Sequence, residues 1–363
     1  MKLLSAHTGW VNTEKRLYWT TDGGNHWSNI TPLLPDRPHA DQKVTGVFFR
    51  DTSEGWAVVS YAEPIPSAEP RAMWDKETAY SVAHTQDSGT TWSAVPLSYP
   101  ELPKWIQDTF AGPGSPYFVD SQHGWLDMLY EGNSKPGKLL ATEDGGKTWN
   151  WVNSPGLFGF ITFSSLQDGW LLGYENLYVT HDGCKTWQKV KLTPPSGIRA
   201  DIFPNIQSPP VFPDQQNGYL LVHYAVTPEA PGKLVIYSTK DGGINWQPIN
   251  TLPEAHVTSS MANFPFAVVG SDLVISSGLR SSDLGITLVP LRSNSSSAKA
   301  SYRAVLAMTF ADTANGWVLT PGRQLLATND GGSTWTDISP EHAPSFGIRT
   351  PPAQNGPKPN AVH

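Results

Sequence analysis

The most conspicuous acids of the sequence belong to six copies of one short motif. In each copy a threonine stands two residues before an aspartate, and a tryptophan follows five residues after it. An aspartate in this setting accepts hydrogen bonds from backbone N–H groups just ahead of it, as in an Asx-turn, and the tryptophan packs between neighbouring elements. We therefore predict that these carboxylates are structural and not catalytic. They are Asp22, Asp87, Asp144, Asp182, Asp241 and Asp330.

The fourth copy departs from the others at one position. The residue two after the aspartate is glycine in five copies and Cys184 in the fourth. Glycine allows a backbone angle that is closed to other residues. We therefore expect either a strained backbone at Cys184 or a rearranged turn. As the only cysteine, it cannot form a disulfide within the chain.

A different set of residues could bind a ligand. Aromatic, arginine and carboxylate side chains occur together in long segments between predicted strands, chiefly residues 61–80 and 96–116. Tryptophan, tyrosine and arginine are the side chains most enriched at binding hot spots. Such a mixture could hold a sugar or a peptide, and the alternative is that the aromatic side chains only pack under their own loops. The candidate ligand-binding residues are Arg71, Trp74, Trp105, Tyr130, Arg199 and Asp201.

Other kinds of site have little support. The ten histidines show no metal-ligand spacing, so we expect neither a metal nor another cofactor. A net charge of −7 without a Lys/Arg cluster argues against nucleic acid as a partner. No apolar run approaches the roughly 18 residues that span a bilayer. Because the first repeat begins within three residues of Met1, we expect that an export or anchor segment has been removed and that the protein is an extracytoplasmic monomer.

A second motif predicts the elements that position the first. Glycine followed by Trp or Tyr opens a short apolar strand ahead of each aspartate motif, and an apolar anchor, usually Phe, lies seven residues before that aromatic. Each unit therefore has four predicted strands. Strand A ends near the Phe, strand B starts at Gly-Trp, strand C runs into the aspartate motif, and strand D leaves from its tryptophan. Four short strands repeated radially are the signature of a β-propeller.

Residues 247–305 decide the number of blades. The interval between the last two aspartate motifs is too long for one blade, and we find no copy of the motif within it. Three short apolar runs there predict strands of a degenerate blade. We therefore expect an all-β, seven-bladed propeller of four-stranded antiparallel blades over residues 1–339, followed by a Pro/Gly/Asn-rich tail over residues 340–363. The alternative is six blades with a large insertion.

The connections between strands divide between two faces of such a propeller. A–B turns and the aspartate motifs share one face, here called the turn face, and they keep a nearly constant length. B–C and D–A loops share the opposite face, here called the loop face, and nearly all length variation falls there. Loops on a rigid scaffold are where function accumulates. We therefore predict that a partner binds the loop face.

The pattern Ser/Thr-x-Asp-x-Gly-x-Thr-Trp resembles the Asp-box, or BNR, repeat. Together with the Phe and Gly-Trp motifs, it is most similar to the seven-bladed photosystem II assembly/stability factors and their bacterial relatives, over roughly residues 1–338. This resemblance implies a non-enzymatic docking scaffold. Sialidases share the box, but their Arg-Ile-Pro stretch is absent here. Xyloglucanase-type glycosidases clamp glucan between two propellers, and this chain has one.

Two functions follow as hypotheses. The favoured one is a non-enzymatic scaffold that docks a protein or a carbohydrate on the loop face. The alternative is a sialidase-like or other glycoside hydrolase that uses carboxylates of the same face. Glycoside hydrolysis would need two carboxylates roughly 5–10 Å apart.

Overall fold

A computed structural model provides the structure of the chain. It describes residues 1–13, 15–34, 42–64, 76–100, 110–130, 138–156, 159–173, 176–198, 202–206, 208–226, 232–255, 266–269, 272–275, 279–283, 287, 289–290, 305–320, 322–340 and 346–347. All regular elements of the described residues are β-strands. These residues include no helix that could cross a membrane.

The described strands form seven sheets, numbered 1 to 7 along the chain. Their strands are β1–β4 (Lys2–Leu3, Gly9–Asn12, Leu17–Thr20, Trp27–Asn29), β5–β8 (Lys43–Phe49, Gly55–Pro64, Lys76–Thr85, Ser93–Pro96), β9–β12 (Phe110–Phe118, Gly124–Tyr130, Lys138–Thr142, Asn150–Val152), β13–β16 (Phe160–Phe163, Gly169–Leu172, Leu177–Thr180, Gln188–Lys189), β17–β20 (Phe203–Ile206, Gly218–Ala225, Gly232–Thr239, Gln247–Ala255), β21–β24 (Phe266–Val269, Asp272–Ile275, Leu279–Ser281, Val289–Pro290) and β25–β28 (Ala307–Phe310, Gly316–Leu319, Leu325–Thr328, Thr336–Asp337).

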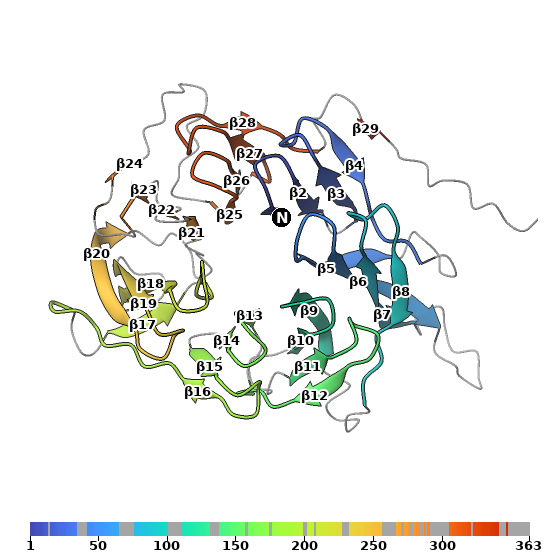
Figure 1. Cartoon of the computed structure of the whole chain (residues 1–363), viewed down its shortest axis with the longest axis horizontal. Coiled ribbons are helices and arrows are strands. Elements are labelled where there is room, and N and C mark those ends of the chain that lie inside the picture. The colour runs from blue at the N-terminus through green and yellow to red at the C-terminus, as the bar shows by residue number, and fades with distance from the viewer. Residues whose placement is uncertain are drawn as a thin grey trace, which may run out of the picture.

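The sheets surround a central axis, with the first strand of a sheet nearest the centre and the last at the rim (Figure 1). Each sheet is a four-stranded antiparallel meander, so the predicted all-β propeller with blades of this kind is confirmed. Sheet 6, β21–β24, lies in the segment expected to be a degenerate blade. The short strand β29 (Phe346–Gly347) adds in parallel to β4 at the rim of sheet 1.

The aspartate motif closes the turn between the third and fourth strands through its own side chains. In sheet 3, the Thr142 hydroxyl donates to Asp144 Oδ1 (2.8 Å) and accepts from the Gly146 amide (2.9 Å). The Thr148 amide donates to Asp144 Oδ1 (2.9 Å), and its hydroxyl donates to Oδ2 (2.6 Å). Both carboxylate oxygens are therefore occupied within the turn, here called the aspartate turn.

Sheet 6 contains an aspartate turn that the sequence comparison missed. The Ser281 hydroxyl donates to Asp283 Oδ1 (2.7 Å), and the Thr287 amide and hydroxyl donate to the two oxygens of Asp283. The expectation that residues 247–305 hold no copy of the motif is therefore wrong. It failed because serine replaces the threonine and Leu288 replaces the tryptophan, while the hydrogen-bonding positions are kept.

Neighbouring sheets are joined by an aromatic stack that starts at the Gly-Trp motif. Trp125 of sheet 3 lies parallel to Phe163 of sheet 4, with ring centroids 3.6 Å apart and an interplanar angle of 4°. Trp56 stacks in the same way on Phe118 of sheet 3, at 3.8 Å. The phenylalanine ring in turn covers the glycine of its own sheet, so that a Cβ at Gly124 would lie 2.6 Å from the Phe118 ring. This contact explains why glycine precedes the tryptophan.

The ring closes between the first and last sheets. Trp317 of sheet 7 lies against Gly9 of sheet 1, so that a Cβ there would be 2.6 Å from the indole. The indole N–H of Trp27 donates to the Ile338 carbonyl oxygen (2.8 Å). Trp27 and Trp317 are both buried, with ring centroids 5.5 Å apart. Side-chain packing therefore joins the two ends of the ring.

Replacing Trp149 by Ala tests the packing role of the turn tryptophans. Trp149 is 2% exposed, and its indole N–H donates to the Gly146 carbonyl oxygen (3.0 Å). We expect the free energy of unfolding to fall by about 3–5 kcal/mol, as for other buried large-to-small changes. Trp187 occupies the same position in sheet 4 but is only half-buried, so Trp187→Ala should cost less. Equal stability of Trp149→Ala and wild type in denaturant unfolding would contradict the prediction.

Cys184 adopts the expected strained backbone. Its φ is 68°, and its amide still donates to the Thr180 hydroxyl (3.0 Å), so the aspartate turn is strained but not rearranged. A non-glycine residue at positive φ costs about 1 kcal/mol or more.

We therefore predict that Cys184→Gly is neutral to stabilising, by up to about 1 kcal/mol in thermal unfolding. The thiol packs beside Trp125 and Phe163, and its burial raises the pKa of Cys184 to about 12. A clear loss of stability on substitution would show that this packing outweighs the backbone strain.

Candidate functional site

Hydrogen bonds and strand register define the two faces. In sheet 3 the Gly145 amide of the aspartate turn donates to the Gln122 carbonyl oxygen of the A–B turn (2.9 Å). The long hairpin of sheet 2 pairs Gly55 with Thr85 at this end and Pro64 with Lys76 at the other. The B–C loops therefore emerge on the face opposite to the aspartate turns.

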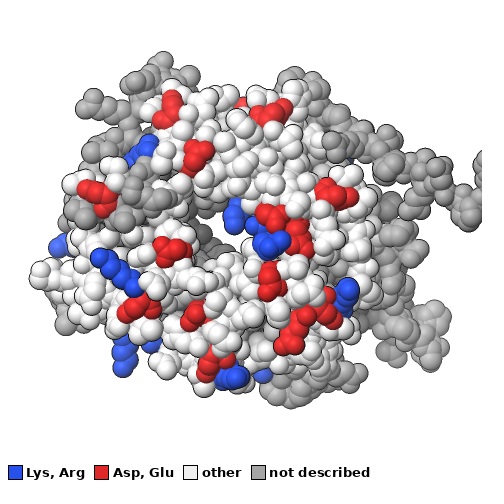
Figure 2. All heavy atoms as spheres, in the orientation of Figure 1, with Lys and Arg blue, Asp and Glu red and all other residues white. Residues whose placement is uncertain are grey.

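The turn face is rich in acids, which are spread around the whole ring and its central opening (Figure 2). Hydrogen bonds from the hydroxyl and amide of Thr186 lower the pKa of Asp182 to about 2. The corresponding hydrogen bonds of Thr287 and Ser281 do the same for Asp283. In the A–B turns, acids such as Asp120 accept two backbone N–H groups at once. These carboxylates are therefore ionised acceptors that hold turns.

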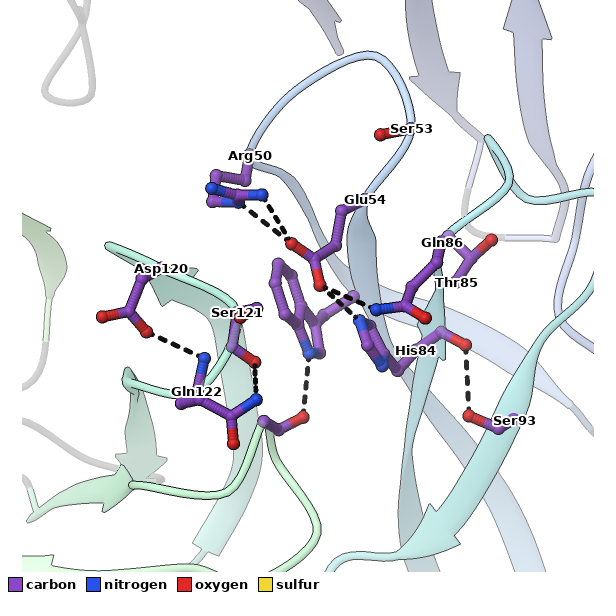
Figure 3. Close-up of polar contacts among 12 residues, drawn as sticks. Arg50, Ser53, Glu54, His84, Thr85, Gln86, Ser93, Asp120, Ser121 and Gln122 are labelled. Atoms are coloured by element: carbon purple, nitrogen blue, oxygen red, sulfur yellow. Dashed lines mark hydrogen bonds and ion pairs between the residues drawn. The ribbon is translucent and has the colours of Figure 1, made fainter.

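A buried polar cluster on the same face is also fully partnered. Glu54, 4% exposed, lies between Arg50 and His84 (Figure 3). Its Oε2 is 2.8 Å from Arg50 Nη2, and its Oε1 is 3.1 Å from His84 Nε2. The His84 ring stacks on Trp56 at 4.7 Å, and the Trp56 indole N–H donates to the Gly145 carbonyl oxygen of sheet 3 (2.9 Å). The cluster therefore links a turn of sheet 2 to sheet 3.

The loop face differs from the turn face in its described side chains. Six large hydrophobic side chains are exposed, and four of them lie at loop-face ends of strands or in loop-face connections: Leu33, Phe160, Val226 and Leu306. Phe160 is 61% exposed and begins β13, the innermost strand of sheet 4. An exposed phenyl ring on a rigid strand is a suitable anchor for a partner.

The residues predicted from sequence to bind a ligand cannot be placed relative to these exposed hydrophobic side chains. Arg71, Trp74, Trp105, Arg199 and Asp201 lie outside the described residues. Only the backbone of Tyr130 is described, as the last residue of β10. Sequence reasoning did not select Phe160, because a single phenylalanine at the start of a short strand gives no sign of its exposure.

Two loop-face connections are anchored by aromatic side chains. After β8, the Pro100 carbonyl oxygen accepts the indole N–H of Trp151 (2.8 Å), and Tyr99 packs edge-on against that ring (5.2 Å). After β16, the Thr193 carbonyl oxygen accepts the hydroxyl of Tyr237, which lies 2.6 Å from the hydroxyl of Tyr224. Aromatic side chains of the strands, Trp151 of β12 and Tyr237 of β19, therefore hold these two connections in place.

Asp127 is an acid that sequence reasoning also missed. It is 2% exposed in β10, and its Oδ2 accepts the Gly159 amide (2.7 Å) of the connection into sheet 4. Its Oδ1 has no hydrogen-bond partner among the described residues. Burial raises the pKa of Asp127 to about 7. One feature of the sequence could have revealed Asp127. It stands three residues after Gly124, and the equivalent positions of other repeats hold apolar residues such as Val58 and Leu172.

No metal site is formed by the described residues, which contain no group of three or more His, Cys, Asp or Glu side chains able to hold an ion. Two carboxylates on strands that run to the loop face are buried or already hydrogen-bonded. Asp127 is buried, and Asp337 accepts the amide of Ser339 (2.9 Å).

Radial four-stranded antiparallel sheets with a variable loop face define the chain as a β-propeller. No family model and no curated protein matches the sequence. Among solved structures, it is similar to one described as YCF48 bound to D1 peptide, with 20% identity, a TM-score of 0.54 and coverage of 90% of this chain and 91% of that chain. YCF48 from Cyanidioschyzon merolae is 17% identical, with a TM-score of 0.50 and coverage of 84% and 86%.

The GH74 enzyme of Niastella koreensis has the same kind of fold. It is 14% identical with a TM-score of 0.51, and the match covers 92% of this chain and 54% of that chain. This chain therefore spans about half the length of the GH74 enzyme. At these identities the similarities establish the fold, and function has to be argued from the site.

Asp127→Asn tests the burial of this carboxyl. The folded pKa of about 7 lies above the unfolded value of 3.8, so the folded state keeps its proton through a range in which the unfolded state has lost it. The contribution of Asp127 to stability is fully present below pH 3.8 and is lost as pH rises through 7. This loss amounts to at most about 4 kcal/mol.

The variant lacks this titration, so its stability relative to wild type should rise between pH 4 and pH 8. Denaturant midpoints of both proteins at several pH values measure the difference. A constant difference across this range would show that Asp127 titrates normally in the folded protein.

Proposed function

We propose that the chain is an Asp-box propeller that acts as a non-enzymatic scaffold and docks a protein partner on its loop face. The aspartate turns, including the one at Asp283, support the Asp-box assignment. The six repeated aspartates are then structural residues. Location outside the cytoplasm is part of the proposal and rests on the resemblance to extracytoplasmic propeller scaffolds.

One observation carries this proposal: the two faces differ in the side chains that they leave free to contact a partner. The described carboxylates of the aspartate turns are engaged by turn N–H and O–H groups, and Glu54 is engaged by Arg50 and His84. Most of the exposed large hydrophobic side chains are on the loop face. Exposed apolar side chains on a rigid frame favour a protein over a small polar ligand, since their burial drives association.

Phe160 is the proposed central anchor, and the residues predicted from sequence would add to the binding surface. Trp74 and Trp105 would supply further aromatic contacts, and Arg71 would pair with an acidic group of the partner. Tyr130 ends β10 of sheet 3, and Arg199 and Asp201 belong in sequence to the connection between sheets 4 and 5. The structure titled as YCF48 bound to D1 peptide shows a propeller of similar fold with a peptide ligand.

A matched pair of variants tests the role of Phe160. Peptides that bind the purified protein are first selected from a displayed library. Phe160→Ser should weaken the selected peptides at least tenfold, about 1.4 kcal/mol, by removing the anchor. Ile244→Ser is the control, because Ile244 is 65% exposed against 61% for Phe160 but lies in the aspartate turn of sheet 5.

The expected result is weakened binding by Phe160→Ser and unchanged binding by Ile244→Ser, measured by titration calorimetry at equal thermal stability. Loss of binding in the Ile244 variant alone would move the site to the turn face. Hydrolysis of aryl glycosides by the wild-type protein, abolished by changing one carboxylate, would replace the scaffold by the glycosidase alternative.

A further inference from the structure

Asp127 joins two sheets directly beside the proposed anchor. Its Oδ2 accepts the amide of Gly159, the residue before Phe160. We propose that Asp127 is a positioning residue for Phe160 and responds to pH: in its neutral form the carboxyl stays buried against Gly159, and the cost of burying its ionised form favours opening of this contact to water. This inference rests on the proposed function only where it concerns partner binding at Phe160. The structural change can be measured without one.

The backbone at Gly159 lies close against β14. A side chain at this residue would overlap the carbonyl oxygen of Leu172, the residue that pairs with Phe160 in β14. The amide of Gly159 is thus directed at Asp127 while its other side lies against Leu172. A change in the Asp127 carboxyl is therefore transmitted to the position where β13 and the exposed ring of Phe160 begin.

Sheet 1 shows that a neutral group can make the same link. Asn12 stands three residues after Gly9, as Asp127 stands three after Gly124. Its side-chain amide donates to the Val44 carbonyl oxygen of sheet 2 (2.8 Å). The polar link between neighbouring sheets therefore does not require an ionisable group, and the carboxyl at Asp127 adds a pH dependence that Asn12 lacks.

The ionised form of Asp127 has no compensating charge in its described surroundings. The described residues of β9, β10, β13, β14 and of the connection 153–156 and 159 contain no lysine, arginine or histidine. Lys138 of β11 pairs with Met128 and makes no ion pair with Asp127. The titratable Tyr117 of β9 donates its hydroxyl to the Phe163 carbonyl oxygen (2.9 Å).

A carboxylate at this place would have only backbone N–H groups, those of Gly159 and Met128, to compensate its charge, and its Oδ1 has no partner among the described residues. A buried charge with such incomplete hydrogen bonding is costly, and the cost is relieved when water reaches it. Water can enter only if the contact between β10 and Gly159 opens. Raising the pH should therefore increase the local opening of this contact.

Hydrogen exchange of the backbone tests the proposal. Exchange of residues 159–163 is measured between pH 5.5 and 8.5 in the full chain, corrected for the intrinsic pH dependence of exchange. In the wild type we expect protection to fall about fivefold or more across this range. In Asp127→Asn, protection should stay constant. Residues 43–49, beside Asn12, are the internal control and should show no such change in either protein.

If the protection of residues 159–163 depends on pH equally in wild type and Asp127→Asn, the proposal is overturned, because the titration of Asp127 then has no part in the opening. If the variant does not fold, the proposal is tested within the wild type by comparing the protection of residues 159–163 with that of residues 43–49. Identical pH profiles of protection in the two segments would reject the proposal. The outcome is independent of the scaffold proposal. Peptide binding that needs Phe160 could persist without any pH effect, and a pH-dependent opening could occur in a protein that binds no peptide there.

Discussion

The stack of a tryptophan on the phenylalanine of the next sheet, and of that ring on a glycine, is the contact on which the ring depends. Trp125 and Phe163 lie 3.6 Å apart and are buried. Each large aromatic side chain removes roughly 150–250 Å² from water, worth about 4–6 kcal/mol by area. Because such stacks join sheets 2 and 3, 3 and 4, and 4 and 5, stability is shared between these neighbours, as in other repeat architectures. A change in one sheet is therefore felt first by the sheets beside it.

This contact also fixes where the protein can vary. The phenylalanine, the glycine and the tryptophan must keep their spacing for the stack to form, so the A–B turn keeps its length. The aspartate turn is fixed by its own hydrogen bonds, which use both oxygens of Asp144. Both constraints act on the turn face. Insertions accumulate at the opposite ends of the strands, where neither constraint applies, and most of the exposed large apolar residues that the structure describes, such as Phe160, lie there.

The sequence predicted the parts of the fold that repeat. Strands that start at Gly-Trp, the buried Trp149 and the positive φ of Cys184 all follow from comparing copies of one unit. It did not predict the turn at Asp283, because the comparison gave weight to a tryptophan that the hydrogen bonds do not need. Asp127 and Phe160 were missed for another reason. The burial of Asp127, the exposure of Phe160 and the contact between their sheets depend on residues that are distant in sequence. A feature that occurs in one sheet only also cannot be found by comparing repeats.

The alternative of a glycosidase can be restricted to one part of the molecule. The carboxylates of the described aspartate turns hold those turns, and Asp127 is buried. Glu63 and Glu77 are register partners in the hairpin of β6 and β7. Retaining hydrolysis would need a pair of carboxylates roughly 5 Å apart. Catalysis would also require the pair to face a sugar across the loop face. A scaffold requires only the exposed surface that begins at Phe160.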